Sequence, residues 1–160
     1  MQTQIQSVVF DIGNVLVRWS PLEIIRLTFG ENDDNPIMAR AVFQSEIWLA
    51  LNQGDITWDE AKQAYQNQFG FSDIHSAALF DYIKRTQILI HGSQALLREV
   101  KDAGYSVYAL TDNVLDIVDY LKQTYDFWPL FDGEIISANE GCLKPNATIY
   151  QALTQRYQLD

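Results

Sequence analysis

The order of strand-like and helical segments constrains the fold of this chain more than any other feature of its sequence. A short run of apolar and β-branched residues, Ser7–Phe10, ends at the acidic residue Asp11. Such a run is typical of a buried strand of a parallel sheet. A long stretch with helical spacing follows, and strand-like and helical segments alternate after it. This order predicts an α/β fold whose parallel sheet is interrupted after its first strand by a helical insertion.

The helical stretch covers residues 20–88, and we expect about four helices in it. Ser20 and Glu23 have the spacing of a capping box at a helix start, and Thr57 and Glu60 have the same spacing. Glycines and polar turns separate the apolar stripes. The predicted helices are residues 20–30, 37–51, 57–68 and 72–85.

The second half of the sequence alternates between two periodicities. Apolar runs of strand length are followed by stretches in which apolar residues recur at helical spacing. This alternation is typical of strands joined by crossover helices. The predicted elements are a helix at 93–103, a strand at 105–110, a helix at 114–124, a strand at 133–137 and a helix at 146–157.

Composition excludes several classes of function. The formal net charge of −10 argues against general binding of nucleic acid or of anionic membrane surfaces, both of which need clustered Lys and Arg. The single cysteine, Cys142, excludes an intramolecular disulfide framework and a metal site with several cysteines. No apolar run approaches the ~20 residues of a membrane span. The polar segment Met1–Gln6 shows no secretory signal, so we expect a cytoplasmic protein.

Four polar residues fall at or just beyond the expected carboxyl ends of the strands. They are Asp11, Thr111, Asp112 and Lys144. Ligands of open α/β sheets bind at this edge. Asp11 can act as a nucleophile or a metal ligand, Thr111 can donate its hydroxyl group to a phosphate oxygen, and Lys144 can neutralise an oxyanion. Together with a metal ion, this set suits attack on phosphorus by a carboxylate.

Three segments resemble the motifs of the haloacid dehalogenase (HAD) superfamily. VVFDIGNV (residues 8–15) resembles the first motif, ALTDN (109–113) the second and LKPNATIY (143–150) the third. Their order agrees with the family, and the helical stretch lies between the first two. The resemblance covers nearly the whole chain and implies a Rossmann-like core, residues 1–18 and 89–160, with an inserted helical cap at 19–88.

The resemblance also implies a chemistry. Asp11 would be the nucleophile of a phosphatase that forms an aspartyl-phosphate, Thr111 would contact the transferring phosphoryl group, and Lys144 would stabilise its charge. Mg²⁺ would be held by the Asp11 carboxylate and the backbone carbonyl of Gly13. The expected substrate is a small phosphorylated metabolite.

Two features depart from the family pattern. The general acid/base aspartate, two residues after the nucleophile, is replaced by Gly13, as in a branch with the form Asp-x-Gly-Asn-Val that includes glucose-1-phosphate phosphatase-like members. The fourth motif, an acidic pair on a further strand, is missing before the sequence stops at Asp160. We therefore expect a truncated form with an incomplete core. Its first strand would become an apolar edge through which copies associate as a homo-oligomer.

Other interpretations remain open at this point. Attack of Asp11 on carbon would make the protein a 2-haloacid dehalogenase that needs no metal ion. A non-catalytic protein with this fold would associate through its sheet edge. Arg18 and Trp19 follow the first motif and are candidates for substrate contact, as Asp112 is for phosphate binding. Trp48 is expected in the core of the helical part.

Overall fold

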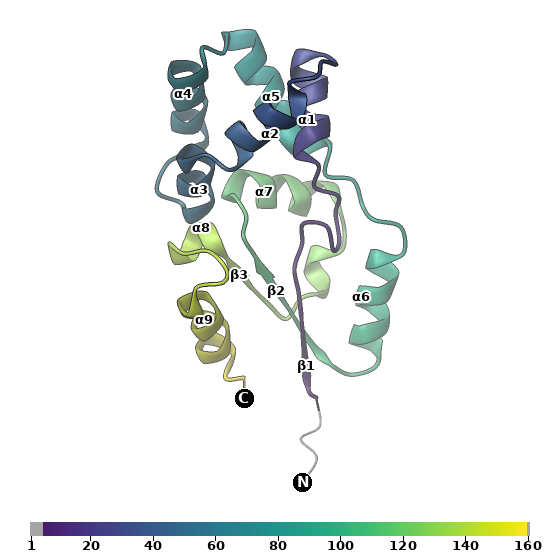
Figure 1. Cartoon of the computed structure of the whole chain (residues 1–160). Coiled ribbons are helices and arrows are strands. Elements are labelled where there is room, and N and C mark those ends of the chain that lie inside the picture. Colours follow the sequence, from purple (N-terminus) through teal and green to yellow (C-terminus); the bar gives the residue numbers. More distant parts are fainter. Residues whose placement is uncertain (1–4, 160) are drawn as a thin grey trace.

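The computed structural model of the chain describes residues 5–159 and has an α/β fold (Figure 1). Within these residues, three parallel strands form a sheet in the order β1-β2-β3: β1 (Ser7–Phe10), β2 (Ser106–Thr111) and β3 (Gly133–Ile136). The predicted fold class is confirmed. The middle strand begins and ends one residue later than expected, so it includes Thr111.

Helices cover both faces of the sheet. Successive residues of a strand point to opposite faces, so each strand contributes side chains to two buried clusters. Val107 and Ala109 of β2 belong to one buried cluster, whereas Tyr108 and Leu110 belong to another. The first cluster also contains side chains of α6 and α7, and the second those of α9. The elements around the sheet are α6 (Ser93–Asp102), α7 (Leu115–Thr124), the 3-10 helix η1 (Trp128–Leu130), α8 (Ser137–Glu140) and α9 (Ala147–Tyr157).

The segment between β1 and α6 contains five helices, all of them described, and not the four that were expected. They are α1 (Pro21–Phe29), α2 (Asn35–Phe43), α3 (Glu46–Gln53), α4 (Trp58–Phe69) and α5 (Asp73–Arg85). The single helix predicted at 37–51 is wrong, because the chain breaks at Gln44 and Ser45. The Ser45 hydroxyl accepts a hydrogen bond from the Trp48 N–H at 3.1 Å and so starts a new helix.

The two predicted capping boxes have different outcomes. Thr57 and Glu60 form theirs: the Thr57 hydroxyl accepts from the Glu60 N–H at 3.2 Å, and the Glu60 carboxylate accepts from the Thr57 N–H at 2.7 Å. The box expected at Ser20 and Glu23 is wrong, because Ser20 makes no side-chain cap. The carboxylate of Glu23 is paired with Arg18 instead.

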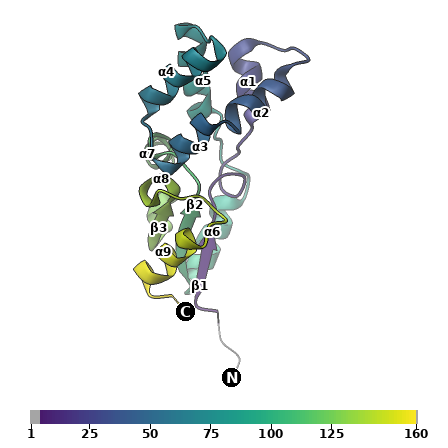
Figure 2. The same ribbon diagram turned by 60° about the vertical axis from the view of Figure 1, so that its left-hand side comes forward.

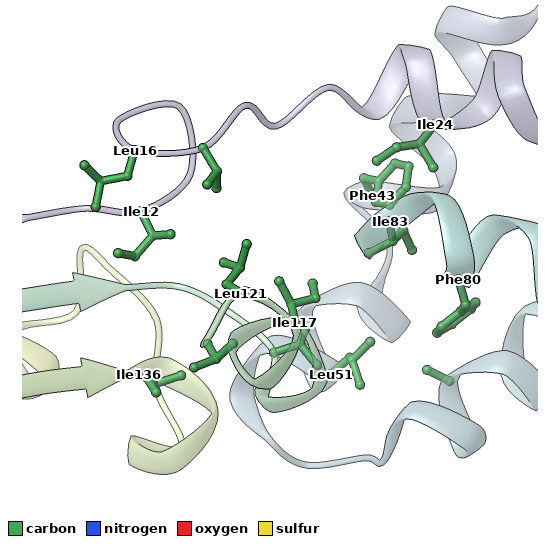
Figure 3. Packing of buried hydrophobic residues seen from close by; sticks show 14 of the residues in the cluster. Ile12, Leu16, Ile24, Phe43, Leu51, Phe80, Ile83, Ile117, Leu121 and Ile136 are labelled. Atoms are coloured by element: carbon green, nitrogen blue, oxygen red, sulfur yellow. The ribbon is translucent and has the colours of Figure 1, made fainter. Parts of the chain in front are cut away.

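One buried cluster continues from the sheet into the five-helix segment. Figure 3 shows Ile117 and Leu121 of α7 between Ile12 and Leu16, which follow β1, and Phe43 at the end of α2. All of these side chains are less than a tenth exposed. The five helices are therefore held to the sheet by apolar packing, to which side chains of α7 contribute.

The five helices gather at the end of the molecule that lies away from the start of β1 and the end of α9 (Figure 2). The division into a core of residues 1–18 and 89–160 and a cap of residues 19–88 stays a prediction. None of the helices described is long and apolar enough to cross a bilayer. The structure describes neither residues 1–4 nor Asp160. The predictions that concern the polar segment Met1–Gln6 and the stop at Asp160 therefore fall partly or wholly outside the described residues.

Candidate active site

The parallel sheet brings the predicted site residues to one edge. Asp11 follows the last residue of β1, and Thr111 ends β2 with Asp112 directly after it. Lys144 comes from the loop between α8 and α9, which returns to the same edge. Because parallel strands all end on one side, residues far apart in the sequence meet there.

A short polar contact at this edge joins Asp11 to Lys144. The ammonium group of Lys144 donates to Oδ2 of Asp11 at 2.6 Å and to the carbonyl oxygen of Leu110 at 3.2 Å. The other carboxylate oxygen of Asp11 accepts from the backbone N–H of Ile12 at 2.7 Å. The Asp11 side chain remains 41% exposed, so the pair is held in place and is also accessible.

Asp112 holds the backbone of the loop that carries Lys144. Its Oδ1 accepts a hydrogen bond from the Lys144 N–H at 3.0 Å. Burial raises the pKa of the Asp112 carboxyl above its ordinary value, and the negative charge of Asp11 adds to this rise. The N–H and the charge of Lys144 oppose it. Asp112 thus positions Lys144 although its surroundings disfavour its charge.

A cavity of about 410 Å³ includes the Asp11–Lys144 pair in its wall. This volume lies in the range of small-molecule sites. The side chains of the sheet end supply the charged part of the wall, and the five-helix segment supplies most of the apolar part and two amide side chains. The lining residues are Asp11, Gly13, Asp112, Asn113, Ile117, Leu143 and Lys144, together with Trp19, Phe43, Trp48, Leu49, Asn52 and Gln87.

Two predicted site residues do not line this cavity. Thr111 is 1% exposed at the end of β2 and is absent from the lining. Arg18 also lies outside the lining, and its guanidinium group pairs with Glu23. Trp19, the next residue, does line the cavity. The roles suggested for Thr111 and Arg18 stay predictions.

Several lining residues were not predicted. Trp48 was expected in the core of the helical part, yet it is half-buried and faces the cavity, beside Phe43. Asn52 and Gln87 were not considered. Helical spacing shows that a side chain lies on an apolar face but not whether that face meets the core or a cavity, so the sequence held no signal for them.

The oxygen atoms beside Asp11 suit a magnesium ion. No hydrogen bond among the described residues reaches the carbonyl oxygen of Gly13, which lines the same cavity as the Asp11 carboxylate. Mg²⁺ prefers oxygen ligands and is commonly held by one or two carboxylates with water and substrate phosphate. The described part of the chain has no cluster of three or more acidic, His or Cys side chains that could form a closed metal cage. The Asp11 carboxylate and the Gly13 carbonyl oxygen are therefore donors of the kind that Mg²⁺ prefers.

Comparison with protein families decides the membership of this chain. A model of the haloacid dehalogenase-like hydrolases matches residues 5–160. The chain belongs to this family. It is therefore an enzyme of the HAD hydrolase type, and the sequence motifs at residues 8–15, 109–113 and 143–150 are in agreement with the match.

Known relatives include a phosphatase. The chain is 28% identical over 151 residues to the sesquiterpene phosphatase AstK of Aspergillus oryzae, an alignment that covers 94% of this chain and 74% of that protein. It is 24% identical to the drimenol cyclase DrtB of Aspergillus calidoustus, of whose length it spans only 27%, with 92% of this chain covered.

Solved structures share the fold. A HAD family enzyme from Bacteroides thetaiotaomicron superposes with a TM-score of 0.75 at 19% identity, covering 99% of this chain and 81% of that one. The same enzyme has been solved as a magnesium complex. At this identity the likeness concerns the fold alone.

Proposed function

We propose that this HAD hydrolase is a Mg²⁺-dependent phosphatase that acts on a small phosphorylated metabolite through an aspartyl-phosphate. The observation that supports it is the Asp11–Lys144 contact of 2.6 Å in the wall of a cavity. A carboxylate next to a cation can attack a phosphoryl group whose negative charge the cation offsets. The similarity to a phosphatase, AstK, points the same way.

The proposed reaction has two displacements at phosphorus. An oxygen of the Asp11 carboxylate attacks the phosphorus atom, the ester P–O bond breaks, and the alcohol leaves. Water then attacks the phosphorus of the aspartyl-phosphate, which releases inorganic phosphate and restores Asp11. The ammonium group of Lys144 stays within reach of the phosphoryl oxygens in both steps, and Asp112 keeps its loop in position.

A bound Mg²⁺ would neutralise phosphoryl charge, and its protein ligands would be the carboxylate of Asp11 and the carbonyl oxygen of Gly13. Asp112 lines the same cavity and can bind a metal-held water molecule. Thr111, which ends β2 next to Asp112, would hold a phosphoryl oxygen.

The leaving alcohol must obtain its proton without a side chain at position 13. The family's acid/base aspartate is Gly13 here, and we assign the chain to the Asp-x-Gly-Asn-Val branch on this motif. Water in the cavity is the proposed proton donor. Activity should therefore depend steeply on the acidity of the alcohol, and phenol esters should react faster than alkyl esters.

Hydrolysis of p-nitrophenyl phosphate with and without Mg²⁺ tests the proposal. We expect turnover that needs the metal ion and that falls at least ~10³-fold in Asp11→Asn, because the amide is not a nucleophile. Asp119→Asn, an exposed aspartate on α7, is the matched control and should keep the activity. Acid-quenched protein should carry one phosphoryl group, which Asp11→Asn should lack.

A second assay, of halide release, decides the alternative in which Asp11 attacks carbon. A 2-haloacid dehalogenase would release halide from 2-chloropropionate without Mg²⁺ and would leave p-nitrophenyl phosphate intact. That result would overturn the phosphatase proposal while the family membership stands. We also propose that the cap, residues 19–88, supplies the surface that selects the substrate.

A further inference from the structure

Three aromatic side chains that line the cavity, Trp19, Phe43 and Trp48, pack together as a block. The rings of Trp19 and Trp48 are stacked, with centroids 5.4 Å apart and an angle of 10° between planes. The ring of Phe43 meets both edge-on, at 5.2 Å from Trp19 and 5.1 Å from Trp48. Mutual packing of this kind is favourable and restricts each ring to one orientation. The block is therefore a preformed apolar surface.

The block begins directly beside the residues that would hold the phosphoryl group. The backbone N–H of Trp19 donates to Oδ1 of Asn14 at 2.9 Å, which ties Trp19 to the loop after Asp11. A Cβ atom on Gly13 would lie 3.9 Å from that of Trp19. A substrate whose phosphoryl group is at Asp11 must therefore place its organic part close to these rings.

The cavity wall offers one cation only. Among the described residues that line it, Lys144 alone has a positive charge, and Asp11 and Asp112 are acidic. The nearby Arg18 is paired with Glu23. Once Lys144 faces the phosphoryl group, no positive charge is left for a second phosphate or a carboxylate of the substrate. A second anionic group would lose its hydration without compensation.

Each of the three neutral polar side chains of the wall, Asn52, Gln87 and Asn113, makes one hydrogen bond within the protein, and that of Asn113 is accepted from the Val114 N–H at 2.9 Å. The amide NH₂ of Asn52 donates to the Trp48 carbonyl at 2.8 Å, and that of Gln87 donates to the Ile83 carbonyl at 3.1 Å. Their remaining capacity to bind the many hydroxyl groups of a sugar is small. A polyol would leave hydroxyl groups without partners, at a cost for each of them.

From these contacts we propose that the substrate is the monophosphate ester of an apolar alcohol, whose hydrocarbon part packs on the block of Trp19, Phe43 and Trp48. This inference rests on the proposed phosphatase function and names its substrate class. It makes Trp48 a specificity-determining residue, because its half-buried side chain packs against the core cluster and also lines the cavity.

Four alkyl monophosphates test the substrate class. Benzyl phosphate and hexyl phosphate are apolar, glycerol 3-phosphate is a polyol, and the phosphate ester of 6-hydroxyhexanoic acid adds a carboxylate to the hexyl chain. All are esters of primary alcohols, and glycerol is the most acidic of these leaving groups, so leaving-group acidity alone would favour glycerol 3-phosphate and cannot produce the expected preference. We expect kcat/KM for the two apolar esters to exceed that for the other two at least tenfold. Equal values would overturn the inference.

Two tryptophan variants test the surface. In Trp48→Ala the ratio of kcat/KM between benzyl phosphate and glycerol 3-phosphate should fall at least fivefold, mainly through KM. Trp58→Ala is the matched control, since Trp58 lies in the same helical segment but packs edge-on against Phe80, outside the cavity. It should keep the ratio. An unchanged ratio in Trp48→Ala, or an equal loss in both variants, would contradict the assignment.

A binding measurement separates this inference from the proposed function. Calorimetry can measure the binding of benzylphosphonate, which is not an ester and cannot be hydrolysed. Methylphosphonate, which has the same charged group without the aromatic ring, is the comparison. Tighter binding of benzylphosphonate that Trp48→Ala weakens would support the apolar surface even if no ester were hydrolysed. Turnover of p-nitrophenyl phosphate with no preference for apolar groups in either assay would keep the phosphatase and reject the substrate class.

Discussion

The carboxylate of Asp112 lies half-buried at the cavity, where it accepts a hydrogen bond from the backbone N–H of Lys144. Burial raises its pKa, and the neighbouring charge of Asp11 acts in the same direction. The folded protein therefore binds the Asp112 proton more tightly than the unfolded chain does. For such a group, the stabilising contribution is present at low pH and is lost as the pH rises through the raised pKa.

The replacement of Asp112 by asparagine tests this balance at the scale of one residue. The amide oxygen of Asp112→Asn can still accept the Lys144 N–H, and no charge is buried. At pH 7 we expect a gain in the free energy of unfolding, of less than about 1 kcal/mol because the group is only partly buried. The gain should vanish at a pH where the native carboxyl is protonated. Urea unfolding at both pH values measures it, with Asp119→Asn as the control. A loss of stability at pH 7 would contradict the sign.

At the scale of an element, α1 and α4 begin with the same sequence signal but with different contacts. Thr57 caps α4, and the backbone N–H of each of Thr57 and Glu60 donates a hydrogen bond to the side chain of the other. Ser20 precedes α1 and makes no side-chain cap, and the carboxylate of Glu23 is paired with Arg18. The start of α1 is defined by Pro21 at its first position.

The two alanine variants should therefore differ. Thr57→Ala removes a cap and is expected to lower the free energy of unfolding by about 1 kcal/mol. Ser20→Ala removes no hydrogen bond of this kind and should change it by less than ~0.5 kcal/mol. Chemical denaturation of both variants measures the difference. Equal losses would show that Ser20 caps α1 in solution.

The elements that the sequence predicted well are those defined by local patterns. The strand before Asp11 and the helix beginning at Thr57 depend on apolar runs and capping residues that are near each other in the chain. The break at Ser45 was missed because the apolar spacing continues across it, and the position of Trp48 in the cavity wall depends on how α3 is oriented. The Asp11–Lys144 contact followed from the predicted fold, because the carboxyl ends of parallel strands and the loops beyond them meet at one edge, although no local pattern relates residues so far apart.

At the scale of the whole molecule, the five-helix segment meets the sheet end through α3 and α8. Gly54 follows α3 with φ 77°, and a Cβ atom there would lie 2.2 Å from the carbonyl oxygen of Ala138. Beside it, the Ser137 hydroxyl donates to the Asn52 carbonyl at 2.6 Å. This joint holds α3, and with it Trp48, over the cavity.

Gly54→Ala should loosen this joint. Its control is Gly70→Ala, because Gly70 follows α4 in the same left-handed conformation, φ 69°, with no atom within 4 Å of the added Cβ. Gly70→Ala should cost about 1–2 kcal/mol from the backbone alone. Gly54→Ala should cost ~1–3 kcal/mol more, because its methyl group overlaps a backbone oxygen. Denaturant unfolding gives both values, and equal costs would mean that α3 does not dock on α8 in solution.

The outer edge of β1 is a surface through which two copies of the chain are expected to associate. Among the described residues, β1 pairs with β2 on one side only, and Val9 in its middle is 42% exposed. An apolar edge of this kind can pair with the same edge of a second copy around a two-fold axis. The net charge of −10 opposes the approach of two copies, so association should strengthen with salt.

We expect light scattering to give a particle larger than the 18.4 kDa monomer, with the dimer fraction rising with protein and salt concentration. Val9→Lys places a charge at the centre of this edge and should restore the monomer. Ile74→Lys changes an 80% exposed side chain on α5, away from the sheet, and should leave the association unchanged. A particle of monomer mass under all conditions would contradict pairing through β1, and the edge would then be protected by its short length of four residues and by the charge of the molecule.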